Sequence, residues 1–182
     1  MDPYLENWLK AVIVSGYSTR AELLESLTEE ADSPQEALAV LNKYWYRWEE
    51  ELLKREGIED DHGRLLRAYA ELEAKGIVCE ENFTCCQSCG HYEIKKRRPE
   101  DWGYLFFHEQ IGGGDLYLAH GLFDFEGLPE KEADLRDELL AATAVEAFRS
   151  AGLTVDWDGS SGQRIHLHIT DWRKPLPTGG GS

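Results

Sequence analysis

Apolar residues in the first part of the chain recur every three or four positions, which is the spacing of amphipathic helices. Residues typical of helix ends flank these segments. Gly16 follows the first, and Thr19 with Glu22 has the spacing of a capping box at the start of the second. Ser33 and Pro34 open the third, as a cap followed by proline at the first helical position. The pattern predicts helices over residues 2–14, 19–30, 33–55 and 60–75.

The third predicted helix carries the strongest apolar stripe. Its members follow one another at spacings of three and four, so they share one side of the helix. Such a stripe is more often the side buried in a core than a ligand-binding surface. We therefore predict a core stripe of Leu38, Leu41, Trp45, Trp48 and Leu52.

Four segments in the second half of the chain have the composition of strands. Residues 103–108 and 116–122 are rich in aromatic and aliphatic side chains, as strands are. The glycines at 112–114 supply a turn between them, so the two segments pair as a hairpin. Residues 153–158 and 164–172 predict a second hairpin across another glycine-containing turn.

An amphipathic helix over residues 130–151 separates the two predicted hairpins. The expected fold class is therefore α+β. It has a helical N-terminal half, then a four-stranded antiparallel sheet in β-β-α-β-β order, with a short cysteine-bearing helix between them. The expected division is a helical region at 1–78, an α+β region at 79–173 and a Pro- and Gly-rich flexible tail at 174–182.

The stretch with the clearest chemical potential lies where the helices give way to the strands. Residues 80–94 read E-E-N-F-T-C-C-Q-S-C-G-H-Y-E-I and contain Cys85, Cys86 and Cys89. The fourth cysteine of the chain, Cys79, lies just before them. These four thiols are the main candidates for reactivity or for metal binding.

Thr84 and Gln87 have the spacing of a capping box, which predicts that the three cysteines occupy the first turns of a short helix. The positive end of that helix would favour a thiolate and lower its pKa. Three interpretations remain open. The thiols ligate zinc, since two thiolates three residues apart can hold one tetrahedral ion; Cys86 and Cys89 form a redox pair; or all three are packing groups beneath Phe83.

A three-cysteine zinc site needs a fourth ligand. His91 follows the cysteines directly, whereas His108 and His120 lie in apolar predicted strands and could reach them. The competing interpretation is that each is a hydrogen-bonded core histidine. Our predicted metal set is Cys85, Cys86, Cys89 and His108.

The second hairpin carries a further polar pattern. Arg164, His166 and His168 alternate with apolar residues, so the three share one face of a strand. A turn centred near Ser161 would set Asp156 opposite His166, and Asp156, His166 and His168 could then bind a metal. The simpler interpretation, which we favour, is the solvent-exposed face of an antiparallel sheet.

Charge excludes two classes of partner. The formal net charge is −16, from 35 acidic and 19 basic side chains. Such a field repels nucleic acid and anionic lipid. The basic run at residues 95–98 is interpreted as a solvated loop. We therefore expect no nucleic-acid and no membrane partner, while a protein partner fits the composition.

Location follows from what the sequence lacks. There is no run of about 18 apolar residues, so no membrane span is expected. The first residues lack a basic region followed by an apolar one, so no secretory signal is expected. We expect a cytoplasmic protein whose cysteines stay reduced and form no disulfide framework.

The motif F-T-C-C-Q-S-C-G, with D-x-x-R-L-L-x-A-Y upstream, resembles a family of uncharacterised bacterial proteins that form a domain of unknown function. Members show F-T-C-C-x-x-C-G and, later, a Phe-x-His-x-Gln strand end. The resemblance covers roughly residues 63–173 and implies a domain assignment, without an established activity. The matching pieces are residues 83–90, 106–110, 116–121, 156–160 and 171–173.

Two functional classes follow. The first is a non-catalytic binding or regulatory protein with a three-cysteine zinc site. The second is a thiol oxidoreductase or redox sensor that uses Cys86 and Cys89. Motifs for hydrolases or for nucleotide binding are absent from the sequence.

Overall fold

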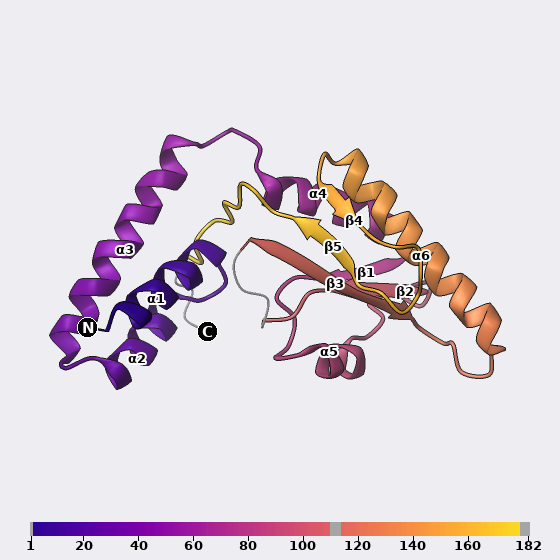
Figure 1. The fold of residues 1–182 in the computed structure, drawn as a ribbon, viewed down its shortest axis with the longest axis horizontal. Coiled ribbons are helices and arrows are strands. Elements are labelled where there is room, and N and C mark those ends of the chain that lie inside the picture. Colours follow the sequence, from indigo (N-terminus) through magenta and orange to yellow (C-terminus); the bar gives the residue numbers. More distant parts are fainter. Residues whose placement is uncertain (1, 110–113, 179–182) are drawn as a thin grey trace. The chain divides into compact units, whose positions relative to one another are not determined.

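The computed structural model of the protein describes residues 2–109 and 114–178. Across these residues it contains six helices and five strands (Figure 1). They form two compact units, Met1–Asp60 with Asp171–Ser182, and Asp61–Thr170. None of the described helices combines the length and the apolar character that a membrane crossing requires.

The first unit is built from the three helices α1 (Pro3–Ser15), α2 (Arg20–Glu30) and α3 (Pro34–Lys54). Their starts agree closely with the sequence prediction because the predicted caps form. At the start of α2, the backbone N–H of Thr19 donates to the Glu22 carboxylate at 2.7 Å, which completes the capping box. The three helices pack around an apolar cluster of Leu9, Ile13, Leu23, Leu27, Ala37, Leu41, Tyr44 and Trp45.

The predicted stripe of α3 is confirmed in its centre and wrong at its start. Leu41 and Trp45 are buried, and Trp48 is half-buried against the same cluster. Leu38, in contrast, is 40% exposed. The buried side of the helix begins one position earlier, at Ala37, and this choice depends on how α1 and α2 pack and not on α3 alone.

The segment after residue 170 packs on the helices of the first unit. The indole Nε1 of Trp172 donates to the carbonyl of Ser15 at 3.1 Å. The backbone N–H of Arg173 donates to Asp60 at 2.6 Å, and Leu176 packs against the apolar cluster. Of these residues only Leu176 belongs to the predicted tail, and its packing was not anticipated from the sequence.

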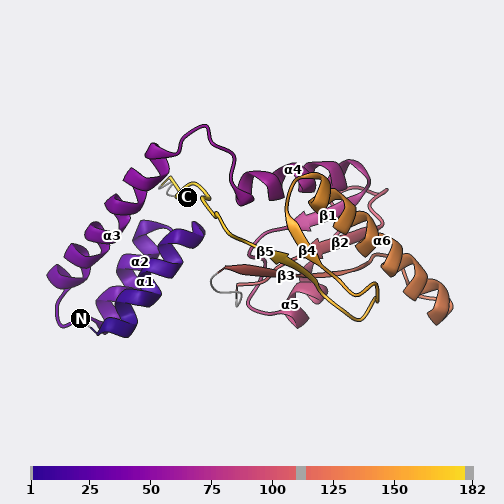
Figure 2. The same cartoon turned by 45° about the horizontal axis from the view of Figure 1, so that its top comes forward.

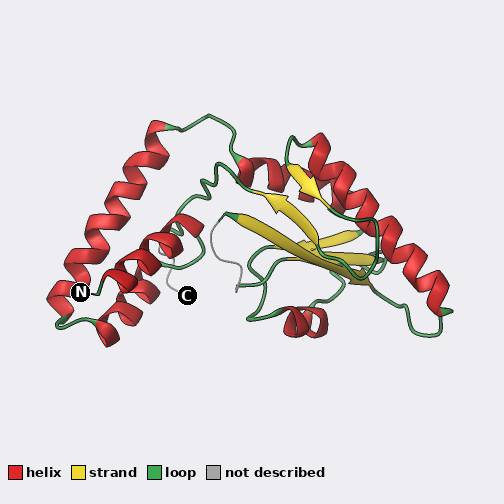
Figure 3. Ribbon diagram, viewed as in Figure 1, coloured by secondary structure: helices red, strands yellow, loops and turns green. Residues whose placement is uncertain are grey.

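The second unit holds all the described strands and the other helices (Figure 3). Residues 61–78, which the sequence grouped with the N-terminal helices, make their contacts here. In chain order the elements are α4 (Asp61–Ala74), β1 (Ile77–Glu80), α5 (Gln87–Glu93), β2 (Gly103–Phe106), β3 (Asp115–Leu122), α6 (Glu130–Ser150), β4 (Thr154–Asp156) and β5 (Ile165–His168).

The strands form one five-stranded sheet in the order β1-β2-β3-β5-β4. The α+β fold class is confirmed, but the prediction of four antiparallel strands is wrong. The missed strand is β1, which pairs in parallel with β2 through Ile77↔Gly103 to Glu80↔Phe106. A run of four residues carries too little periodicity to be recognised, and its parallel pairing is a long-range contact. The strand expected to reach residue 172 ends at His168.

Helices cover the two faces of the sheet unequally. α4 and α6 lie together over one face, and the short α5 lies on the other (Figures 1 and 2). Under α5 an aromatic cluster forms from both the helix end and the strands. Its buried members are Val78, Ile94, Tyr104, Phe106 and Ala119.

Candidate metal centre

The cysteines begin in the loop between β1 and α5, residues 81–86, which we call the cysteine loop. It is tied to the segment that follows β2. The backbone N–H of Phe83 donates to the carbonyl of Phe107 at 2.8 Å, and that of Glu109 donates to the carbonyl of Thr84 at 3.1 Å. Glu81 also contacts His62 of α4 at 3.0 Å. The loop is therefore held at both ends.

The backbone of the cysteine loop departs from the predicted helix. Asn82 and Thr84 have φ angles of 48° and 60°, in the left-handed region that a β-branched residue such as threonine rarely adopts. The Thr84 hydroxyl donates to the carbonyl of Cys86 at 3.2 Å and caps no helix N–H. The capping-box prediction is wrong here, because α5 begins at Gln87 with Cys86 at its N-cap.

Helix α5 is fixed against β2 by a close approach. A Cβ atom added to Gly90 would lie 2.1 Å from the Phe106 ring, so a side chain at this position would push the helix off the sheet. One residue further, the His91 ring packs edge-on against Phe106 with centroids 5.3 Å apart. Its Nδ1 lies 2.9 Å from the Tyr104 hydroxyl. Cys89, just before Gly90, is thereby held in place.

The loop and the helix bring three sulfurs together. The Sγ atoms of Cys85, Cys86 and Cys89, which we call the cysteine cluster, all lie within 4.8 Å of one another. The Cys85 and Cys89 sulfurs are 3.6 Å apart. Zn–S bonds of about 2.3 Å in a tetrahedron separate two sulfurs by about 3.8 Å. The cluster is thus close to the geometry in which it could hold a metal ion.

The three thiols differ in acidity. A hydrogen bond from the backbone N–H of Cys89, followed by one from its side chain, lowers the pKa of Cys86. The same pairing acts on Cys89 in the opposite sense, since hydrogen bonds to Cys86 and then to Cys85 raise the pKa of Cys89 to about 12. Cys86 is therefore the first of the pair to become a thiolate, the form that binds metals and attacks disulfides.

Exposure argues against the interpretation that the cluster is packing material. Cys85 is exposed, and Cys86 and Cys89 are half-buried. Phe83 packs on Phe106, with centroids 5.9 Å apart, without enclosing the thiols in a core. Cys79 is the contrasting case, because it is buried in β1 and desolvation raises the pKa of its thiol well above the usual range. A buried thiol that stays protonated reacts poorly as a nucleophile or metal ligand.

The histidines predicted as fourth ligands lie outside the cysteine cluster. His108 is 8% exposed and lies between Phe107 and Glu109, the two residues whose backbone holds the cysteine loop. Burial lowers its pKa and so keeps the ring neutral. Among the residues that the structure describes, however, no ring nitrogen or carboxylate oxygen joins the three sulfurs within 4.8 Å.

His120 is directed elsewhere by its register. It pairs with Leu105, and its Nδ1 lies 3.0 Å from Asp137 of α6. Its Nε2 lies 3.0 Å from the carbonyl of Gln163. His120 is thus the hydrogen-bonded core histidine that the sequence allowed as an alternative. Desolvation lowers its pKa, but the bonds to Asp137 outweigh that effect and the net direction is upward.

A family described as a domain of unknown function, DUF6891, matches residues 1–176. The chain belongs to the DUF6891 family. The match confirms the resemblance carried by the cysteine motif and extends it over both compact units, up to the packed Leu176. Gln110, in the Phe-x-His-x-Gln element, lies outside the described residues. No curated protein and no solved structure matched the chain.

A second group of metal-binding side chains lies on β3 and β5. Ligand atoms of Asp115, His166 and His168 are within 4.8 Å of one another. The predicted register of Asp156 opposite His166 is confirmed. Asp115 was missed, because only the pairing of β3 with β5 brings it to the histidines. The sequence offered one signal for Asp115: it directly follows the glycines at 112–114, immediately before a predicted strand.

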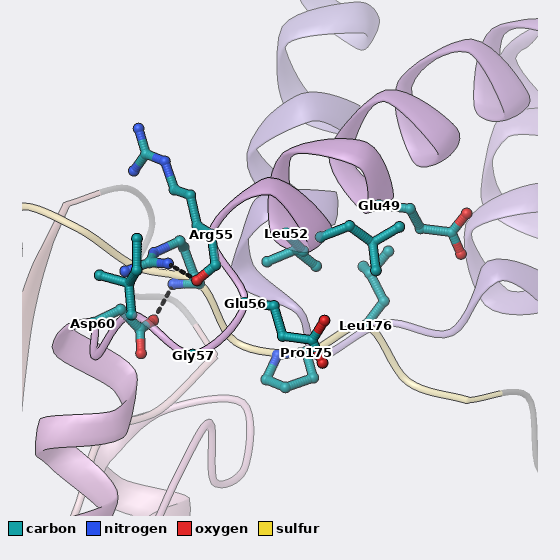
Figure 4. Close-up of a pocket in the computed structure, with 11 residues that line it drawn as sticks. Glu49, Leu52, Arg55, Glu56, Gly57, Asp60, Pro175 and Leu176 are labelled. Carbon is teal, nitrogen blue, oxygen red and sulfur yellow. Dashed lines mark hydrogen bonds between the residues drawn. The ribbon is translucent and has the colours of Figure 1, made fainter.

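The first unit also has a pocket of about 640 Å³, formed where the end of α3 meets the returning C-terminal segment (Figure 4). Leu52, Pro175 and Leu176 line its apolar part, and Asp60 belongs to its polar part. Asp60 accepts the backbone N–H of Arg173, so its carboxylate already serves the anchoring of the chain. Neither a cysteine nor a histidine is among the described lining residues, and sequence reasoning did not find this pocket.

Proposed function

We propose that this protein is a non-catalytic binding or regulatory protein in which Cys85, Cys86 and Cys89 hold a zinc ion. The observation that supports this most is the approach of three partly exposed sulfurs to within 4.8 Å of one another. Thiolates are soft ligands that favour zinc over magnesium or calcium. A site of this kind stabilises the loop that carries it, because the ligands are not assembled in the unfolded chain.

We propose His108 as the fourth ligand. The segment that carries it is hydrogen-bonded to the cysteine loop through the residues on both sides of His108, which keeps this histidine beside the loop. Its lowered pKa favours the neutral imidazole that a metal requires. Both ring nitrogens of His91, the candidate that lies in α5, are within hydrogen-bond distance of Gln87 and Tyr104.

One observation supports a redox role as the second candidate. The pKa of Cys86 is lowered while that of Cys89 is raised, which is the division expected between an attacking and a resolving thiol. In such a reaction the Cys86 thiolate attacks a disulfide of another molecule and releases one thiolate. Cys89 then loses its proton, closes the Cys86–Cys89 disulfide and releases the second thiolate, so the substrate gains two electrons.

The free thiols and the acidic charge of the protein bear on its compartment and its partners. Ligands that are free thiols need a reducing compartment, and we propose the cytoplasm. The net charge of −16 argues against nucleic-acid and membrane partners and leaves a protein partner. The basic run agrees with this, because Arg97 contacts Glu73 and Glu80 while Arg98 contacts Asp101.

Metal analysis tests the zinc proposal. The protein is purified without chelator and without a metal-affinity step, and zinc per chain is measured by mass spectrometry. Cys89→Ser should lose one equivalent of zinc. Cys79→Ala is the matched control and should retain it, since Cys79 is buried in β1 and outside the cluster. Equal zinc content in both variants and in the parent protein would contradict the proposal.

A further inference from the structure

The uncovered part of the sheet face that α5 shares carries a row of polar side chains. Asp115 pairs with His168, and Tyr117 and Asp156 each pair with His166. Ile165 and Leu167, which alternate with the two histidines along β5, are fully buried, so both histidines are directed to the other side of the strand. We call Asp115, Asp156, His166 and His168 the histidine–aspartate face.

Distances within this face match those of ligands around one ion. His166 Nε2 lies 2.8 Å from Asp115 Oδ2, and His168 Nδ1 lies 3.6 Å from the same oxygen. Metal–nitrogen and metal–oxygen bonds of about 2.1 Å place neighbouring ligand atoms about 3.0–3.4 Å apart in octahedral or tetrahedral geometry. Small movements of the side chains would therefore admit an ion between the three.

Asp156 gives His168 the orientation of a metal ligand. Its Oδ2 lies 2.7 Å from His168 Nε2, while His168 Nδ1 is directed to Asp115. A proton on Nε2 donated to Asp156 leaves the lone pair of Nδ1 available on the side of Asp115. At metal sites, the N–H of the ligating histidine's second ring nitrogen usually donates a hydrogen bond to a carboxylate.

Neighbouring side chains hold the other histidine in place. The Tyr117 ring stacks on His166 with centroids 4.3 Å apart and an interplanar angle of 7°. The Arg164 guanidinium lies 5.1 Å from the centre of the Tyr117 ring. The rings of His166 and His168 are themselves 4.1 Å apart. The two imidazoles are thus positioned before any ligand arrives.

We propose that Asp115, His166 and His168 form a second metal site, for a divalent transition-metal ion, with Asp156 as the partner that orients His168. Two imidazoles and one carboxylate are the donor set that suits zinc, iron(II) and related ions, and such sites keep positions open for a further ligand. With neutral imidazoles the two carboxylates carry negative charge, which attracts the cation. This site shares no residue with the cysteine cluster and does not depend on it.

The test is a calorimetric titration of the full-length protein with zinc, without a histidine tag, after metal has been removed. Two binding events are expected. The double variant His166→Ala/His168→Ala should lose one and retain the other, and Cys89→Ser should show the reverse. Circular dichroism confirms that each variant is folded, which is expected because His166 and His168 are only half-buried on the sheet surface.

A single variant tests the orienting role. Asp156→Asn should weaken binding at this site by about 10–100-fold, as loss of a hydrogen-bonding partner does at other metal sites. Asp134→Asn is the matched control, an exposed carboxylate on α6, and should leave binding unchanged. Retention of both binding events in the double histidine variant would overturn the site, and equal affinity of Asp156→Asn and the parent protein at this site would overturn the role of Asp156. Failure of the cysteine site would be distinguishable, because the parent protein would then show only the binding event that the double histidine variant removes.

Discussion

The cysteine cluster and the histidine–aspartate face occupy the same side of one sheet, yet they are assembled by different means. The cluster comes from one short stretch of chain, and its shape depends on a left-handed Thr84 and on the docking of α5. The histidine–aspartate face draws on three strands, β3, β4 and β5, and its shape depends on their register.

The difference predicts how each site responds to perturbation. Two of the three sulfurs of the cysteine cluster lie in a loop outside helices and strands, so a bound metal should couple to local stability there. Strands that are already paired need no ligand to place their side chains. The histidine–aspartate face should therefore keep its geometry without metal, and its loss should cost binding more than stability.

The largest expected effect is on thermal stability. Removal of zinc by a strong chelator should lower the melting temperature, because a ligand at a thousand times its dissociation constant stabilises the binding state by about 4 kcal/mol. Cys89→Ser should lower it comparably and abolish the response to chelator. Differential scanning calorimetry measures both. The comparison variant is His166→Ala/His168→Ala, whose melting temperature should still fall when chelator is added. If this variant lost the response to chelator and Cys89→Ser kept it, the contrast between the two sites would be reversed.

A substitution on α5 should affect the cysteine cluster and leave the histidine–aspartate face unchanged. Gly90→Ala places a Cβ against the Phe106 ring, and overpacking of this kind costs about 1–3 kcal/mol. We expect reduced stability in urea and weaker zinc binding by the cysteines, with the histidine–aspartate face unaffected. Gly162→Ala is the control, since an added Cβ there meets no atom within 4 Å. If the two variants are equally stable, the docking of α5 does not position Cys89.

Alkylation rates should rank the thiols. In metal-free protein near neutral pH, Cys86 should react fastest with iodoacetamide because the N–H of Cys89 lowers its pKa. Cys89 should be slower, and Cys79 should remain unlabelled, since it is buried and its pKa is raised. Peptide mass spectrometry gives the order. Zinc should protect Cys86, whereas rapid labelling in the presence of zinc would favour the redox role.

The smallest expected effect is the pH dependence of the histidine–aspartate face without metal. Hydrogen bonding to Asp156, ahead of attraction by Asp115, raises the pKa of His168, and the histidines lower the pKa of both carboxyls. Because its pKa is raised on folding, His168 adds to folding stability below about pH 6.5, and this contribution is lost as pH rises through the folded pKa. Because their pKa values are lowered, Asp115 and Asp156 add to folding stability above about pH 3.9, and this contribution is lost as pH falls through the folded pKa values.

The stability difference between the parent protein and His168→Gln should therefore be largest from about pH 4 to 6.5. Urea denaturation across this range measures it. The same substitution should matter little near pH 8 in the absence of metal. A difference that grows steadily towards alkaline pH would contradict the pairing of His168 with Asp156.

Sequence reasoning succeeded where the determining contacts are local. The capped starts of α2 and α3 follow from residues within one turn, and the three cysteines are close because they are close in sequence. It also placed Asp156 opposite His166, since the short turn between β4 and β5 fixes their register. In each case fewer than about a dozen residues decide the outcome, as in hairpins generally.

It failed where distant residues decide. β1 is a strand because β2 lies beside it, and Asp115 joins two histidines about fifty positions later through sheet order. The start of α5 was misplaced because two hydrogen bonds, from the N–H of Phe83 to Phe107 and from the N–H of Glu109 to Thr84, fix Thr84 in a conformation that no capping rule predicts.

Cobalt substitution is the most direct test of the central claim that Cys85, Cys86 and Cys89 bind a metal. Cobalt(II) replaces zinc in thiolate sites and shows sulfur-to-metal charge-transfer absorption that nitrogen and oxygen ligands do not produce. We predict this absorption at one equivalent of cobalt in the parent protein and in His166→Ala/His168→Ala, and its loss in Cys89→Ser. Absence of thiolate charge transfer in the fully reduced parent protein, at cobalt concentrations that saturate binding, would contradict the claim.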